Sequence, residues 1–247
     1  MANSNGSFGL RPIGIVGQGA NTTGATEYRI ASANNTKMYQ GSPVIPIAGG
    51  TISVAQAAAG GNVAFLGVFW GVEYVRASDG KTIWAPSWQG TAAGADSNFP
   101  IKAFVYDNPM QTFTIATSNV VAAANTEAEV RAMVFKNIAL ATATAGNDTT
   151  GIASATADLN TSAATAALQL RVIGVQNDPD NSDFTAAGIP LIVRLNTSFN
   201  SANGGQLVRP PRQPLHTRPR TLNGPLEAGQ SCVCLEQRVR RRSNCWR

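Results

Sequence analysis

The acidic loop 177–184, NDPDNSDF, is the sharpest candidate for chemistry in this chain of 247 residues. Four of its side chains carry the oxygen ligands that a hard cation such as Ca²⁺ prefers: Asp178, Asp180, Asn181 and Asp183. The loop lacks the glycine and the glutamate that an EF-hand needs at fixed positions. Asp and Asn also bond to nearby backbone in turns, where Pro179 fixes φ. We therefore expect a turn without metal or cofactor, with a calcium site as the alternative.

Catalytic side chains are scarce in residues 1–205. This part contains neither His nor Cys, which excludes Ser-His-Asp catalysis, Cys-His catalysis and any His-based metal site within it. The segment 17–26, GQGANTTGAT, resembles a phosphate loop only superficially, because Ala25 stands where that loop needs a lysine. Twelve acidic residues leave a paired-carboxylate glycan hydrolase open, but no two of them stand out as a pair. We expect a protein that is not an enzyme.

Residues 206–247 differ in composition from the rest of the chain. They carry nine Arg and two acidic residues, whereas residues 1–205 carry ten basic and twelve acidic residues. All cysteines and the only histidine also lie there: His216, Cys232, Cys234 and Cys245. An Arg-rich arm for nucleic acid and a zinc site with weak C-x-C spacing stay open. The abrupt change favours a frame-shifted or replaced terminus, so we expect a disordered tail and no nucleic-acid partner.

Residues 67–90 hold three of the four tryptophans in two apolar runs around Asp79-Gly80. Asp-Gly predicts a hairpin with a type I′ turn, in which both central residues need φ > 0. Strict alternation places Phe69, Gly71, Glu73 and Val75 on one face of the first strand, and Val68, Trp70, Val72 and Tyr74 on the other. Both faces are largely apolar, so the hairpin should pack inside a β fold or against another chain. The candidate interface residues are Trp70, Tyr74, Trp84 and Trp88, with a plain hydrophobic core as the alternative for each.

Short apolar runs separated by turn residues predict the strands that position these side chains. The runs cover 28–31, 43–47, 51–54, 63–75, 81–84, 101–106, 111–116, 168–175 and 189–195. Such spacing is typical of an antiparallel β-sandwich or barrel, so we expect an all-β fold. The capping-box pattern from Thr126 to Glu129 predicts a short helix near 126–135. The Ala/Thr-rich residues 141–167 are interpreted as a long excursion.

Composition divides the chain into three parts. We expect an extended, unpacked N-terminal arm over 1–26, a β-rich domain over 27–205 and the Arg/Pro-rich tail over 206–247. Only 13% of the residues are charged, against roughly 25% in a typical soluble domain, which indicates a polar but weakly charged surface. We find neither a signal-peptide pattern nor an apolar run long enough for a membrane span. We therefore expect a soluble protein made in the cytoplasm, with no membrane partner.

Four segments form a recognisable series along the chain: YRIASANNTKMYQGSPV (28–44), GVFWGVEYVRASDGKTIWAPSW (67–88), IKAFVYDNPMQTFTIA (101–116) and AALQLRVIGVQNDPDN (166–181). In this order they resemble the capsid decoration (cement) proteins of marine and cyanobacterial tailed bacteriophages. The resemblance covers about residues 8–200 and stops before the tail. It implies a non-enzymatic, oligomeric protein of the virion that coats the outer face of the capsid and bridges major capsid protein subunits. A phage fibre or adhesin module that binds host glycans is the alternative.

Overall fold

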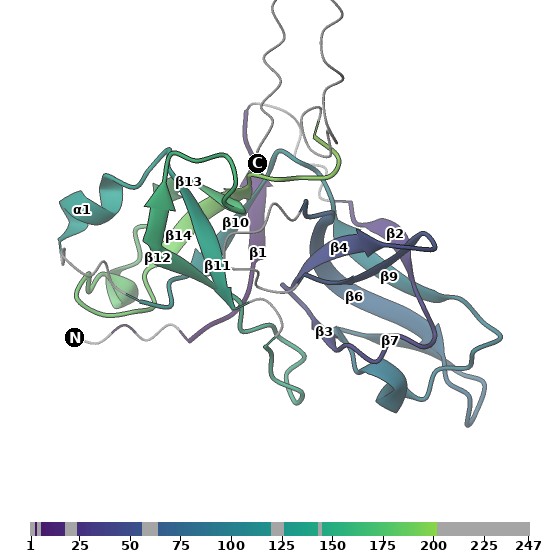
Figure 1. The fold of residues 1–247 in the computed structure, drawn as a ribbon. Coiled ribbons are helices and arrows are strands. Elements are labelled where there is room, and N and C mark those ends of the chain that lie inside the picture. The colour runs from purple at the N-terminus through teal and green to yellow at the C-terminus, as the bar shows by residue number, and fades with distance from the viewer. Residues whose placement is uncertain are drawn as a thin grey trace, which may run out of the picture. The chain divides into compact units, whose positions relative to one another are not determined.

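The computed structural model describes residue 3 and residues 6–17, 24–55, 64–119, 126–142 and 145–201. Every described residue belongs to one compact unit, Met1–Leu207. The tail 206–247 and most of the phosphate-loop-like segment 17–26 lie outside the described residues, as do the expectations for them. The described part is mostly β, which confirms the predicted fold class (Figure 1).

The first sheet joins six strands from distant parts of the chain in the order β1-β10-β14-β13-β11-β12. Neighbours in this order pair antiparallel. The strands are β1 (Arg11–Ile15), β10 (Gln111–Ala116), β11 (Asn137–Thr142), β12 (Thr156–Ala163), β13 (Leu170–Val175) and β14 (Pro190–Leu195). A short helix, α1 (Glu127–Arg131), precedes β11, and the Glu129 carboxylate accepts a hydrogen bond from the Thr126 backbone N–H at 3.1 Å. The predicted capping box is therefore confirmed.

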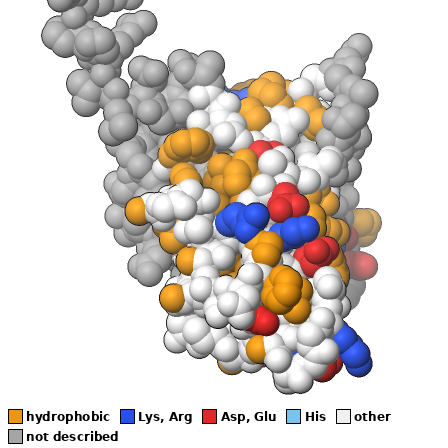
Figure 2. Space-filling view, turned by 90° about the vertical axis from the view of Figure 1, so that its right-hand side faces the viewer, with side chains coloured by type: hydrophobic (Ala, Val, Ile, Leu, Met, Phe, Trp, Pro, Cys, Tyr) orange, Lys and Arg blue, Asp and Glu red, His pale blue; other side chains and the backbone are white. Residues whose placement is uncertain are grey.

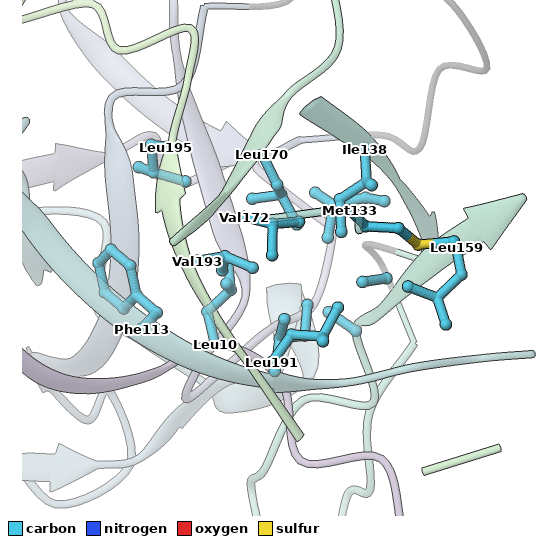
Figure 3. Close-up of a cluster of buried hydrophobic side chains, with 14 of the residues drawn as sticks. Leu10, Phe113, Met133, Ile138, Leu159, Leu170, Val172, Leu191, Val193 and Leu195 are labelled. Carbon is cyan, nitrogen blue, oxygen red and sulfur yellow. The ribbon is translucent and has the colours of Figure 1, made fainter. Parts of the chain in front are cut away.

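Aliphatic side chains fill the inner face of the first sheet. Figure 3 shows Leu170 and Val172 of β13 beside Leu191 and Val193 of β14, with their side chains gathered in one cluster. These positions alternate along each strand because successive strand side chains point to opposite faces. The residues between them therefore lie on the outer face.

The N-terminal segment is part of this fold, which corrects the expectation of an unpacked arm over residues 1–26. β1 pairs with β10, and Leu10 is buried in the cluster of the first sheet (Figure 3). The side-chain amide of Asn3 donates hydrogen bonds to the carbonyls of Asp183 at 2.9 Å and Ala187 at 2.8 Å. Local composition did not reveal this packing, because the partners of the segment lie more than ninety positions further along the chain.

The second sheet contains a closed barrel. Its order is β4-β5-β2-β9-β6-β7, and β4 also pairs with β6, so that all except β7 form a ring. The strands are β2 (Thr26–Ile30), β4 (Pro43–Ile47), β5 (Thr51–Val54), β6 (Gly67–Val75), β7 (Thr82–Ala85) and β9 (Ile101–Tyr106). β2 and β5 pair parallel, and the other neighbours pair antiparallel. Closure leaves fewer strand edges exposed to other chains.

Four short elements complete the described part. β3 (Met38–Tyr39) and β8 (Ser87–Trp88) form a two-stranded sheet, and they pack with the side chains inside the barrel. Two 3-10 helices, η1 (Gly90–Ala93) and η2 (Pro179–Asn181), lie in connecting segments.

The interpretation of residues 141–167 as an excursion is wrong, because β12 lies within this segment and β11 ends in it. Ala155, Ala157 and Leu159 alternate toward the core of the first sheet. Two of these three buried positions are alanines, whose small side chains give a weak hydrophobic pattern. The strand is therefore stabilised mainly by pairing with β11 rather than by its own sequence.

Candidate functional site

The hairpin of β6 and β7 is present, but its turn differs from the prediction. Val75 pairs with Thr82, the Arg76 N–H donates to the Lys81 carbonyl at 2.9 Å, and the Gly80 N–H donates to the Arg76 carbonyl at 2.9 Å. Gly80 has φ 67°, whereas Asp79 does not have a positive φ. The expected type I′ turn is thus wrong, because in this longer loop only the glycine occupies the left-handed region.

A β-bulge at Trp70 inverts the alternation of β6. Phe69 pairs with Val105 and Gly71 with Phe104, which leaves Trp70 as the extra residue. Phe69 and Val72 consequently share the barrel core, although strict alternation had placed them on opposite faces. A bulge shifts every later side chain to the other face of the strand, and nothing in the local pattern of β6 signals it.

Two of the four candidate interface residues lie in the core. Trp88 is 1% exposed, and its indole N–H donates to the Asn34 carbonyl at 3.1 Å. The Tyr74 ring is also buried and meets Trp88 edge-on, with ring centroids 5.8 Å apart. Such edge-to-face pairs add to the stability that burial provides. Tyr74 and Trp88 therefore stabilise the protein itself and do not offer a surface to a partner.

Trp84 is the candidate that faces outward. It lies on β7 directly opposite Glu73, and it is 54% exposed. A Cβ atom added to Gly71 would lie 2.8 Å from Trp84 Cζ2, so the indole rests on the glycine of the neighbouring strand. An aromatic side chain that covers a cross-strand glycine is held by the sheet beneath it. Trp84 thus presents a large apolar surface from a defined position.

Compensating charges surround this tryptophan. Glu73 is the cross-strand neighbour of both Trp84 and Lys102. Lys102 Nζ lies 3.5 Å from Glu73 Oε1 and 3.8 Å from Glu27 Oε2. Figure 2 shows one face of the molecule, on which charged side chains are few and several acidic ones lie close to basic ones. The carboxylate opposite Trp84 is therefore paired with a cation.

Trp70 lines a hollow of about 250 Å³. Its ring meets Tyr106 edge-on at 5.3 Å, and the residue is half-buried. The hollow is also lined by Phe8, Leu10, Arg11, Pro12, Gln40, Gly41 and Ile152. The Arg11 guanidinium lies 4.8 Å from the centroid of the Phe8 ring. Trp70 is therefore only partly available to a partner.

The acidic loop is a turn, as the sequence predicts. The Asp178 carboxylate accepts hydrogen bonds from the Asp180 N–H at 3.1 Å and from Asn181 Nδ2 at 2.7 Å. Asp183 accepts from the hydroxyl and the backbone N–H of Thr185, and these bonds lower the pKa of its carboxyl. Within the described ranges, no group of three or more His, Cys, Asp or Glu side chains is placed to hold a metal ion.

A polar cluster that sequence reasoning missed connects β3 to the loop before β12. Asp148 Oδ2 lies 2.7 Å from Lys37 Nζ, and Tyr39 Oη donates to Asp148 Oδ1 at 2.7 Å. The hydrogen bonds from Lys37 and Tyr39 hold the pKa of Asp148 below its usual value. Burial and the Asp148 carboxylate raise the pKa of Tyr39 to about 12. No local pattern could have revealed these contacts, because the partners lie in distant segments.

None of the described helices is long and apolar enough to cross a membrane. In comparisons with known proteins, no family model, no curated protein and no solved structure matches the chain.

Proposed function

We propose that this chain is a non-enzymatic structural protein of a bacteriophage virion. It would bind the outer face of the capsid and stabilise it by bridging major capsid protein subunits as a homo-oligomer. The four segments that resemble decoration proteins, in their order, support this proposal. On the structural side Trp84 carries it, because its exposed indole rests on Gly71 of the barrel.

Interface energetics explain why this tryptophan suits such a role. Trp side chains contribute strongly at the centres of protein interfaces, where they bury a large apolar area. Trp84 is already seated on paired strands, so its binding costs little side-chain ordering. Binding stabilises the shell by mass action if the site exists only in the assembled lattice, where several subunits each contribute contacts.

Sedimentation with empty, expanded heads of the encoding phage tests the proposal. The wild-type protein should pellet with heads at both low and high salt, because contacts from a weakly charged surface are screened little. Trp84→Ala should bind at least about tenfold more weakly, as expected for a central interface tryptophan. Phe99→Ala is the matched control, since Phe99 is 50% exposed in a separate loop. Wild-type protein that stays in the supernatant overturns the proposal.

A glycan-binding adhesin module is the second candidate, and the surroundings of Trp84 favour it. An open indole face can stack on a sugar ring, while the neighbouring Glu73 and Lys102 can hydrogen-bond its hydroxyl groups. Soluble host glycans that quench tryptophan fluorescence in the wild type but not in Trp84→Phe, combined with no binding to heads, would establish this function instead.

A further inference from the structure

Two arginines lie side by side on the outer face of the first sheet. Arg171 of β13 and Arg194 of β14 are direct cross-strand partners. Direct partners in an antiparallel pair point to the same face, with Cβ atoms about 4.5–5.5 Å apart. The following or preceding residues Val172 and Val193 lie in the core, so both guanidinium groups belong to the outward face.

Neither arginine has an acidic partner among the described residues. The ion pairs found in those ranges all involve other side chains. Both Nε atoms are buried and make no hydrogen bond, and Arg194 Nη1 contacts only the Met110 sulfur, at 3.4 Å. Like charges directly opposite each other in a sheet destabilise it, and buried donors without partners add to that cost. An anion placed between the guanidinium groups would remove both penalties.

Asn137 extends the same row by one strand. It pairs with Arg171 across β11 and β13, and its side chain is 3% exposed. Its Nδ2 donates to the Thr165 carbonyl at 2.8 Å, which fixes the orientation of the amide, while Oδ1 has no partner. Apart from Ser198 Oγ, the buried side-chain atoms without partners in the described part are therefore all in this row. We call Asn137, Arg171 and Arg194 the arginine row.

We propose that the arginine row binds a phosphate group. Two guanidinium groups carry two positive charges and offer forked donors, which match a dianion with several oxygens. A carboxylate would neutralise only one of these charges. The hydrogen phosphate dianion also keeps one P–OH group, whose hydrogen bond the free Asn137 oxygen can accept. A carboxylate has no proton to donate.

Thermal unfolding of the full chain at pH 6.5 tests this site with three probes at matched ionic strength: inorganic phosphate, glucose 6-phosphate and acetate. Phosphate should raise the Tm of the wild type by several degrees, because a ligand that binds only the folded state stabilises it. Acetate should not raise it. A larger shift with glucose 6-phosphate identifies an ester on a larger molecule as the source, and a larger shift with inorganic phosphate identifies the free ion.

Arg171→Gln and Arg194→Gln should each weaken phosphate binding about tenfold, the effect of one lost charge-assisted contact. In phosphate-free buffer these variants should unfold at the same Tm as the wild type or higher, because a like-charge neighbour is gone. Arg29→Gln is the control, since Arg29 is exposed on β2 of the other sheet.

Should Arg171→Gln fail to fold, Arg171→Lys keeps the charge and removes the planar fork, and it should also weaken binding. A wild type without a phosphate shift, an equal shift with acetate, or an equal loss in Arg29→Gln overturns the proposal. These measurements use no capsid, so their failure leaves the decoration proposal to its own test.

Discussion

Positively charged side chains on the outer faces of the two sheets differ in their ionic partners. On the barrel, Lys102 lies between Glu73 and Glu27 at 3.5 and 3.8 Å. On the first sheet, Arg171 faces Arg194, and neither has a carboxylate partner among the described residues. Both arrangements follow from strand register, which decides which side chains become neighbours. Lys102 of the barrel therefore has two carboxylates beside it, whereas the paired arginines of the first sheet have none among the described residues.

The interiors of the sheets differ as well. The barrel core contains aromatic side chains, including Phe69, Tyr74 and Trp88, whereas the cluster of the first sheet is mainly aliphatic. Trp84 lies on β7, the strand after β6 in the chain, and yet it is exposed. Residue type alone therefore does not separate tryptophans that stabilise the fold from one that can meet a partner.

The largest expected effect tests the contrast between the inside and the outside of the barrel. Trp88→Ala should lower the free energy of unfolding by about 3–5 kcal/mol, because it removes a buried aromatic side chain and leaves a cavity. Trp84→Ala should cost less than about 1 kcal/mol, since its ring is more than half exposed. Urea unfolding followed by far-UV circular dichroism measures both values. Equal losses would contradict the distinction between the two tryptophans.

The next effect concerns the dependence of the first sheet on the N-terminal segment. Leu10→Ala should destabilise the protein by about 2–5 kcal/mol, because Leu10 is 1% exposed within the aliphatic cluster. Ile13→Ala, at a position 46% exposed on β1, is the matched control and should cost much less. The same urea titration applies. A neutral Leu10→Ala would contradict the packing of the N-terminal segment against the first sheet.

A smaller effect, an increase in the free energy of unfolding, is expected just before β11 of the first sheet. Phe135, which precedes β11, has φ 71° and is 78% exposed, and its N–H donates to the Val172 carbonyl at 2.9 Å. A non-glycine residue in the left-handed region costs roughly 1–2 kcal/mol of stability. Glycine avoids this cost, but its greater backbone freedom in the unfolded chain costs roughly 0.5–1 kcal/mol in return. Phe135→Gly should therefore stabilise the protein by about 0.5–1 kcal/mol in thermal or urea unfolding. Phe99→Gly, without positive φ, should not stabilise it.

The smallest effect concerns the polar cluster of Lys37, Tyr39 and Asp148. Because the pKa of Asp148 is lower in the folded state, its charged form stabilises the fold at pH values above the unfolded pKa. This contribution is lost as the pH falls through the folded-state pKa. Asp148→Asn should thus be slightly less stable than wild type at pH 7, and the difference should shrink toward pH 3. Lys37→Gln should show the same trend in urea unfolding, and a difference that grows on acidification would contradict it.

The sequence by itself determined the elements whose signals are local. The strands at 43–47, 51–54, 101–106 and 111–116 have the predicted bounds, because their apolar runs end at turn residues. The capping box of Thr126 and the turn around Asp178 were predictable for the same reason, since each uses side chains within a few positions.

Only the tertiary structure decided which faces and partners these elements have. The bulge at Trp70, the pairing of β1 with β10 and the meeting of Arg171 with Arg194 all depend on strands from distant segments. A one-residue shift in register moves every following side chain to the other face, and a local pattern does not contain that register. The exposure of Trp84 and the burial of Trp88 follow from the register, because the neighbouring strands leave the indole of Trp84 open to solvent and cover the indole of Trp88.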